Sequence, residues 1–430
     1  MGNVLSCKCL RSDPLIVKND VTQSSLNLAK PEMKSVEPPK KMVSIPAPST
    51  HHSLPRNLQR KTSVVKNEEE VVLIAAHNKK KLTVQDFLVE KIIGKGAFGK
   101  VMLVKKVNNP TKVYAMKIMK KSDIYNNKLV ENIVLEKNIL QKSRHPFVVD
   151  LKYAFQSSAK IYLVMEYLEG GELFNLLRKN KRFNEDAARF YLAEVFLAID
   201  YLHKEMKIIY RDLKPENVLL TAQGHVKITD FGLSKQTDNK AYTFAGTPEY
   251  LAPEILINRG HTKSVDFWAL GILLFEMMAG KPPFTSHDRN FLKIEKLIIE
   301  NKPHFPEFFS TEAVDFLKGL LESNPEKRLG AQSADDIKNH AFFKSLNWDV
   351  LYKKKINPPF SPDIRRQAAF NNNAGMEIKE SLDNQILPNL PGITYNPDNL
   401  LNSQRESGFL GSQMESKALK NKVNEIVKRK

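Results

Sequence analysis

Residues 210–220 read YRDLKPENVLL, and DFG follows at residues 230–232. The two segments place Asp212, Asn217 and Asp230 beside short apolar runs that are typical of buried strands. Each of these polar residues alone is typical of a turn. All three in this order, between short strands, instead indicate a catalytic site.

A glycine-rich stretch lies upstream, where GKGAFGKV at residues 94–101 places Gly94, Gly96 and Gly99 between two predicted strands. A dinucleotide-binding fold would have a helix after the glycines, so this context argues against that fold. Without side chains, the backbone can fold closely over a triphosphate. YAMK then places Lys117 where a lysine can reach phosphates. By themselves, the glycines can be only a turn and the lysine only a solvated charge.

These segments and GTPEYLAPE at residues 246–254 follow the order and spacing of a eukaryotic protein kinase, which the chain resembles from Phe87 to Phe343. The resemblance implies an α+β, bilobal protein kinase fold, with a small β-rich lobe carrying one regulatory helix and a larger, mainly helical lobe. It also implies ATP and Mg²⁺ as cofactors, and KPEN at residues 214–217 is similar to the serine/threonine form of the loop. The implied catalytic residues are Asp212, Lys214, Lys117 and Glu136, and the implied metal ligands are Asn217 and Asp230.

The same resemblance implies the residues that bind ATP. The apolar walls of the adenine slot would include Val101 and Leu219, with Met165 at its back, and backbone groups of Glu166 and Leu168 would bond the adenine edge. The full implied set is Ile93, Gly94, Lys95, Gly96, Ala97, Phe98, Gly99, Lys100, Val101, Ala115, Lys117, Met165, Glu166, Leu168 and Leu219.

Further features are similar to the AGC group of serine/threonine kinases, near its Akt, SGK and ribosomal-protein-kinase branches. MEYLEGGELFNLLRK at residues 165–179 and tyrosine in place of histidine at Tyr210 carry this resemblance. INPPFSPD at residues 356–363 is similar to the Pro-Pro-Phe segment that wraps the small lobe in this group. LPGITYNPD at residues 390–398 resembles its hydrophobic motif, with Leu390 and Ile393 in place of two phenylalanines and Thr394 as phosphoacceptor.

The resemblance also implies control by an upstream activating kinase. Thr243 lies where the group has its activation-loop threonine, and Arg211 and Lys235 would hold a phosphate on it. The alternative is an ordinary exposed loop threonine.

Carboxylates at Glu172, Glu216 and Glu276 occupy positions that bind arginines upstream of the target residue in basophilic relatives. Protein substrates with upstream Arg or Lys are therefore expected. The chain contains one such sequence, RKTSVV, in which Arg60 lies three residues before Ser63. We expect Ser63 to be an autophosphorylation site, although chance pairing in a lysine-rich linker gives the same pattern.

The composition limits the remaining classes of partner. The chain has 66 Lys and Arg against 48 Asp and Glu, so its net charge is +18. No zinc-finger spacing or aromatic RNA-binding segment accompanies this charge, so we expect no nucleic-acid partner. FWALGILLFEMMAG at residues 267–280 is too short to cross a bilayer and contains Glu276, which predicts a buried core helix.

The first residues, MGNVLSCKC, fit an N-myristoylation pattern with Gly2 as the acceptor. One myristoyl chain holds a membrane only marginally, so Cys7 and Cys9 are predicted palmitoylation sites that supply a second signal. Two idle thiols in a tail are the alternative. The expected location is the cytoplasmic face of a membrane, with a cytoplasmic pool.

We therefore expect four segments: an acylated, mostly disordered linker at 1–82, a kinase domain at 87–343, an AGC-type tail at 344–411 and a basic helical tail at 412–430. Two other functions fit parts of this pattern. One is a calmodulin-regulated kinase that uses residues 417–430, and the other is a kinase-shaped scaffold without activity.

Overall fold

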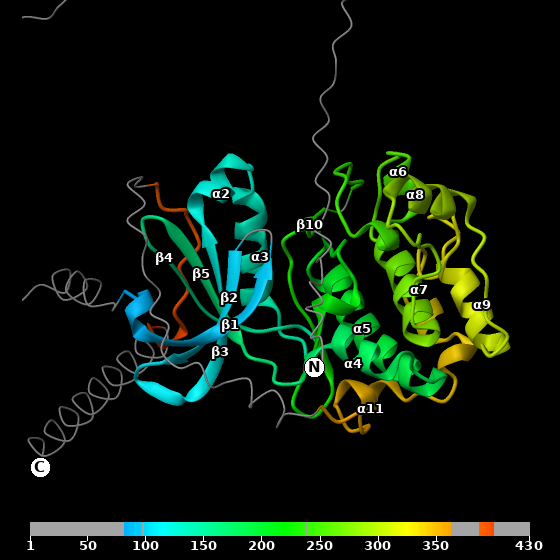
Figure 1. Ribbon diagram of the computed structural model, residues 1–430, viewed down its shortest axis with the longest axis horizontal. Coiled ribbons are helices and arrows are strands. Elements are labelled where there is room, and N and C mark those ends of the chain that lie inside the picture. Colours follow the sequence, from blue (N-terminus) through cyan, green and yellow to red (C-terminus); the bar gives the residue numbers. More distant parts are fainter. Residues whose placement is uncertain (1–80, 97–98, 238, 363–386, 400–430) are drawn as a thin grey trace, which may run out of the picture. The chain divides into compact units, whose positions relative to one another are not determined.

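A computed structural model describes residues 81–96, 99–237, 239–362 and 387–399. Its α+β architecture is the predicted one, with a strand-rich small lobe followed by a helical large lobe (Figure 1). Several predictions lie outside the described residues, namely those for Gly2, Cys7, Cys9, Ser63, Ala97, Phe98 and the basic segment 412–430.

The small lobe is built on a five-stranded antiparallel sheet in the order β1-β2-β3-β5-β4. Successive residues of a strand face opposite sides of the sheet. Tyr162 and Val164 of β5 therefore belong to one apolar cluster, while Ile161 and Leu163 belong to the other. The strands are β1 (Phe87–Gly96), β2 (Gly99–Lys106), β3 (Asn109–Lys120), β4 (Leu151–Gln156) and β5 (Lys160–Glu166).

Two helices accompany this sheet, α2 (Lys121–Asn126) and α3 (Val130–Lys142). The sequence predicts the second of these, and α2 is an additional short helix that it does not predict. A six-residue helix is too short to show a 3.6-residue apolar period, which explains why α2 escapes the pattern.

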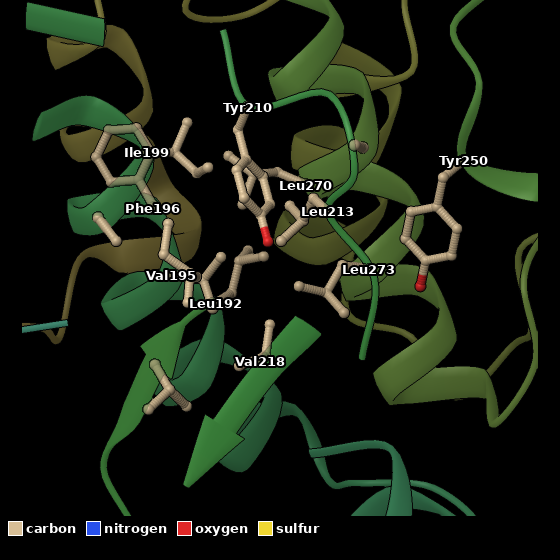
Figure 2. Close-up of a cluster of buried hydrophobic side chains, with 14 of the residues drawn as sticks. Leu192, Val195, Phe196, Ile199, Tyr210, Leu213, Val218, Tyr250, Leu270 and Leu273 are labelled. Carbon is tan, nitrogen blue, oxygen red and sulfur yellow. The ribbon is translucent and has the colours of Figure 1, made fainter. Parts of the chain in front are cut away.

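The large lobe is centred on two packed helices, α5 (Glu185–Glu205) and α7 (Ser264–Ala279). Figure 2 shows their apolar side chains meeting those of the loop between them. The α7 segment is buried along nearly its whole length, which confirms the predicted core helix. No helix in the described part of the chain is long and apolar enough to span a membrane. The remaining α-helices are α4 (Leu173–Asn180), α6 (Pro253–Leu256), α8 (Phe291–Glu300), α9 (Thr311–Leu320), α10 (Asp335–Lys338) and α11 (Trp348–Tyr352).

Two short sheets hold the loops between α5 and α7. In one sheet β6 (Gly171–Glu172), β8 (Val218–Leu220) and β9 (Val226–Ile228) pair in that order, and in the other β7 (Ile208–Ile209) pairs with β10 (Lys235–Gln236). Because these strands immediately flank residues 210–217 and 229–234, both polar loops are fixed at each end.

The Pro-Pro-Phe segment packs on the large lobe, so the expectation that it wraps the small lobe is wrong. The Phe360 ring lies 5.1 Å from that of Phe183 and 6.4 Å from that of Tyr191 of α5. A Cβ at Gly224 would approach the Phe360 carbonyl oxygen to 2.3 Å, so the backbones are in close contact there. Phe360 therefore stacks on an aromatic side chain of α5. The chain reaches the small lobe only after this segment.

Candidate active site

The glycine-rich hairpin joins β1 to β2, with Gly96 opposite Gly99. A Cβ at Gly99 would lie 1.9 Å from the Ile118 carbonyl oxygen, and φ there is +153°, so only glycine fits. At Gly96 a Cβ would meet no atom of the described residues within 4 Å. These residues therefore leave space at Gly96 that a ligand can fill.

The adenine-slot residues line adjacent strands. Ala115 of β3 pairs with Met165 of β5, and Val101 of β2 pairs with Lys117. The N–H of Glu166 donates to the Asp150 carbonyl at 3.1 Å. Of the two backbone groups of Glu166, only the carbonyl can therefore bond the adenine edge. The prediction for Glu166 is thus narrowed to its carbonyl oxygen.

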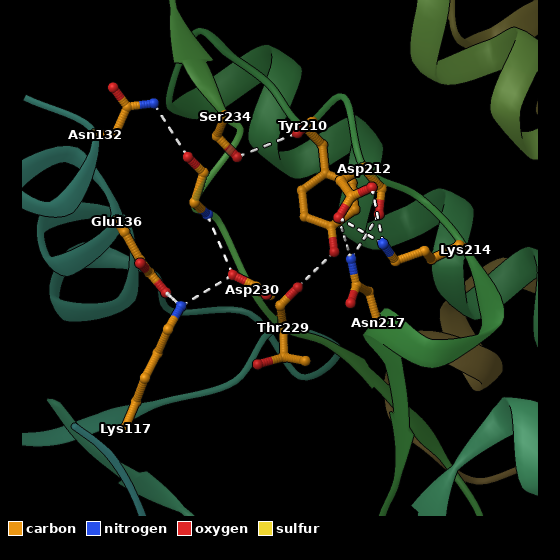
Figure 3. A network of polar contacts seen from close by, with 11 residues as sticks. Lys117, Asn132, Glu136, Tyr210, Asp212, Lys214, Asn217, Thr229, Asp230 and Ser234 are labelled. Carbon is orange, nitrogen blue, oxygen red and sulfur yellow. Dashed lines mark hydrogen bonds and ion pairs between the residues drawn. The ribbon is translucent and has the colours of Figure 1, made fainter. Parts of the chain in front are cut away.

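Lys117, Glu136 and Asp230 come together from β3, α3 and the DFG loop (Figure 3). The Lys117 ammonium lies 2.7 Å from Glu136 Oε1 and 3.0 Å from Asp230 Oδ1. Burial alone would lower the pKa of Lys117, but the two carboxylates outweigh it and raise the pKa. Lys117 is thus a fixed positive charge.

Three polar side chains gather around one carboxylate, that of Asp212. Asn217 Nδ2 donates to Asp212 Oδ2 at 2.8 Å, and the Thr247 hydroxyl donates to Oδ1 at 3.0 Å. The Lys214 ammonium lies 3.1 Å from Asp212 Oδ2 and donates to the Thr247 hydroxyl at 3.0 Å. Burial, partly offset by Lys214, raises the pKa of Asp212 from its ordinary value, which suits a proton acceptor.

Asp266 of α7, which the sequence does not predict as a site residue, binds the backbone of this loop. Its two oxygens accept the backbone N–H groups of Tyr210 and Arg211, each at 2.8 Å. Arg211 and Asp230 both have positive φ, at 67° and 58°, although neither is glycine. Such conformations require support from the surroundings, and the Asp266 hydrogen bonds supply it at Arg211.

The Arg211 guanidinium connects three loops. Its Nε donates to the Leu233 carbonyl at 2.7 Å, and its Nη1 donates to the Thr243 hydroxyl at 2.6 Å. Burial lowers the pKa of Arg211 to about 10, so the group stays charged near neutral pH. The predicted second cation, Lys235, is exposed, and within the described ranges no side-chain contact joins it to Thr243.

An acidic cluster lies beside the catalytic loop and includes Glu249, which the sequence reasoning missed. Burial, with the nearby charges of Glu216 and Glu249, raises the pKa of Glu276 to about 7. The Tyr250 hydroxyl donates to Glu276 Oε2 at 2.5 Å. Glu172, the third predicted carboxylate, lies on β6 opposite Leu219. Thr247, Glu249 and Tyr250 all lie in the segment GTPEYLAPE, which is one of the segments that carry the kinase resemblance. That segment could therefore have identified these residues from the sequence.

The predicted catalytic and metal-binding residues thus meet in one region. A family model for the protein kinase domain matches residues 87–343. The chain belongs to the protein kinase family.

Relatives of this kinase are serine/threonine-protein kinases. A probable serine/threonine-protein kinase of Dictyostelium discoideum is 46% identical, over 72% of this chain and 67% of the relative. A RAC family serine/threonine-protein kinase homolog of the same organism is 43% identical, over 80% of this chain and 76% of its own. Human ribosomal protein S6 kinase alpha-6 is 46% identical, over 64% of this chain and 37% of its own.

These relatives are AGC-like, so the kinase is a serine/threonine kinase of the AGC type. The scaffold without activity gains no support, because Lys117, Asp212, Asn217 and Asp230 are all present and mutually oriented.

Proposed function

We propose that this kinase transfers the γ-phosphoryl group of ATP, with Mg²⁺, to Ser or Thr in basic protein sequences while lipids tether it to a membrane. The assembly of Lys117, Asp212, Asn217 and Asp230 carries the first part of the proposal. Burial alone would raise the pKa of Asp230, but Lys117 outweighs it and lowers the pKa, so the group is an anionic oxygen donor.

The donor set fits Mg²⁺, which prefers one or two carboxylates with substrate phosphates over a full protein cage. Asn217 directs its Nδ2 at Asp212, so its amide oxygen is the atom left for a cation. Asn217 and Asp230 would hold the ion, which supplies charge neutralisation at the phosphates. Among the described residues, no group of three His, Cys, Asp or Glu is placed to hold a metal ion.

The chain's own residues perform the remaining tasks. Lys117, held by Glu136, orients the α- and β-phosphates. Asp212 orients the substrate hydroxyl and accepts its proton as that oxygen bonds to the γ-phosphorus and the bond to ADP breaks. Lys214, fixed by Thr247, lies beside Asp212 and offsets negative charge on the transferred group. Such positioning supplies most of the catalysis in phosphoryl transfer.

Recognition of basic substrates rests on the acidic cluster of Glu216, Glu249 and Glu276. Burial, together with the nearby charges of Glu216 and Glu249, disfavours ionisation of Glu276 and raises its pKa. An arginine from the substrate would relieve this repulsion and donate bidentate hydrogen bonds to a carboxylate. The cluster therefore favours a cationic side chain over a neutral one.

This cluster predicts a pH-dependent KM for an arginine-containing peptide. With a pKa of about 7, the Glu276 carboxyl is neutral below pH 7 and charged above it. We expect KM to fall about tenfold between pH 6 and pH 8, with kcat changing less, because only the ionised form binds arginine well. Glu276→Gln should remove most of the slope and keep KM high. A matched peptide with norleucine in place of arginine is the control, and an arginine-peptide KM that is flat across this range would contradict the proposal.

Regulation by phosphate at Thr243 is part of the same proposal. Phosphorylation there by an upstream kinase would place about two negative charges against the buried Arg211 guanidinium. Phosphorylation of Ser63 and Thr394 stays a prediction.

Membrane tethering rests on the sequence MGNVLSCKC, with a myristoyl group on Gly2 and palmitoyl groups on Cys7 and Cys9. The two kinds of acyl chain together give the stable anchoring that one myristoyl chain lacks.

Replacing Gly2 by alanine should move the kinase from the membrane pellet to the soluble fraction of lysed cells. The reason is that myristoylation requires an N-terminal glycine, while the other early positions of the pattern tolerate change. Asn3→Ala is the matched control and should stay in the pellet. Unchanged pelleting of Gly2→Ala would remove the lipid part of the proposal.

A further inference from the structure

Glu166, at the end of β5, is held by its side chain as well as by its backbone. Its Oε1 accepts the backbone N–H of Asp150 at 2.8 Å and the ammonium of Lys227 at 2.5 Å. Its own N–H donates to the Asp150 carbonyl at 3.1 Å. The N–H and the carboxylate of this residue are therefore both fixed, and the remaining polar group is the carbonyl that would bond the adenine edge.

Lys227 extends from a strand that is itself fixed. In β9 the N–H of Val226 donates to Glu194 Oε2 at 2.8 Å, and the N–H of Ile228 donates to the Phe147 carbonyl at 2.9 Å. Lys227 lies between these two anchored residues, and its side chain is only 10% exposed. Its ammonium therefore has little freedom to leave the carboxylate that it binds.

This ion pair joins the two lobes beside the adenine slot. Glu166 belongs to the five-stranded sheet of the small lobe, whereas Lys227 belongs to the three-stranded sheet of the large lobe. In the second sheet Lys227 pairs with Leu219, a predicted wall of the slot. In the first sheet Met165, predicted at the back of the slot, directly precedes Glu166. The pair thus ties together two sides of the predicted nucleotide site.

The charges around the pair make the contact specific. Among the described contacts, Glu166 is the only carboxylate bound to Lys227, because Asp150 directs its own carboxylate to Lys152 at 3.2 Å. Another lysine, Lys354, lies close by, and burial together with the charge of Lys227 lowers the pKa of Lys354. An ion pair that is largely removed from water is stronger than the same pair in bulk solvent.

Adenine and guanine differ at the atom that would face the Glu166 carbonyl. Adenine presents the N6 amine, which donates a hydrogen bond, whereas guanine presents the O6 oxygen, which only accepts one. A carbonyl that is held in place bonds the first base and repels the second. A carbonyl that can rotate away loses the hydrogen bond and the repulsion together.

We propose that Lys227 is a positioning residue for nucleotide choice: its ion pair with Glu166 holds the Glu166 carbonyl so that the kinase selects adenine over guanine nucleotides. This role rests on the proposed use of ATP and adds the residue that sets the base preference. Lys227 acts through Glu166, because its ammonium contacts the carboxylate of that residue.

The test uses the full chain, with mass spectrometry confirming equal phosphate at Thr243 in every variant. Lys227→Met removes the ammonium and keeps a long apolar side chain. Glu166→Gln keeps an acceptor for the Asp150 N–H but removes the negative charge. Lys152→Met is the matched control, because that lysine lies on β4 and binds the Asp150 carboxylate, with no described contact to Glu166.

The readout is the preference for ATP over GTP, measured as the ratio of the two kcat/KM values. In Lys227→Met and in Glu166→Gln we expect this ratio to fall about tenfold, the size of one lost hydrogen bond. The KM for ATP should rise while kcat and the KM for the peptide change by less than about twofold, because the catalytic loop and the acidic cluster are untouched. Lys152→Met should keep the ratio of the wild type.

Two further results distinguish positioning from a general loss of stability. The double variant should lose no more preference than Lys227→Met alone, since both changes break one interaction. An additive loss in the double variant would overturn the proposal. So would equal weakening of ATP and GTP, which indicates a generally disturbed site.

Calorimetric titration of ADP and GDP with magnesium measures the same preference without catalysis. Suppose that the wild type transfers no phosphate, yet binds ADP better than GDP and loses that preference in Lys227→Met. The proposed function then fails while the role of Lys227 stands. A wild type that binds ADP and GDP equally well would instead remove the role of Lys227.

Discussion

Replacing Asp212 by alanine will lower kcat by a factor of about 10²–10⁴ and leave ATP bound, because the general base is lost while the nucleotide site is kept. The Asp212 carboxylate is the common partner of Asn217, Lys214 and Thr247. The measurement is phosphate transfer to a basic peptide, paired with calorimetric titration of ATP and magnesium.

Asp212→Asn keeps the shape and most hydrogen bonds of the side chain, and it should show the same loss if alanine disturbs the fold. Asp315→Asn is the matched control, because that carboxylate is 78% exposed and pairs only with His340 among the contacts described. Transfer by either Asp212 variant at the rate of the control would contradict the assigned role.

The second large effect is expected at Thr243. The Thr243 hydroxyl already accepts a hydrogen bond from Arg211 Nη1 at 2.6 Å. A phosphate at Thr243 would therefore bind a guanidinium that also donates to the Leu233 carbonyl. Thr243→Ala removes this tie between the catalytic, DFG and activation loops. We expect kcat/KM to fall by about 5–150-fold relative to the phosphorylated kinase, the range of a typical coupling between sites.

The neighbouring Tyr242, 66% exposed, offers a control in Tyr242→Phe, which should keep full activity. Arg211→Met should match Thr243→Ala and should not respond to phosphate at Thr243. If Thr243→Ala works as well as the phosphorylated kinase, the residue is an ordinary loop threonine.

Local motifs were enough to select the proposed catalytic side chains, because phosphoryl transfer requires particular residues at short spacings. Asp212, Lys214 and Asn217 lie within one loop, so their proximity follows from the sequence itself. Lys117 and Glu136 required the family resemblance, since a β-strand lysine alone is more often a solvated charge. The structure then places them 2.7 Å apart.

Residues that act through the tertiary fold were not predictable in this way. Asp266 lies in a helix that reads as continuous apolar core, and nothing near it in the sequence shows that it binds the backbone of Tyr210 and Arg211. Lys227 and Glu166 lie 61 positions apart, so no local period joins them. The prediction for Phe360 names the small lobe, whereas its ring packs on the large lobe. A short tail motif does not specify the surface on which it packs.

The family match and the packed core of this kinase end at different residues. The family match ends at residue 343, yet Phe360, Leu390 and Ile393 complete aromatic and aliphatic packing in both lobes. A fragment of residues 87–343 would expose the apolar surfaces that these side chains cover, together with the outer edge of β4. Both exposed features would favour self-association. Side chains beyond the family match therefore form part of the packed core of this kinase.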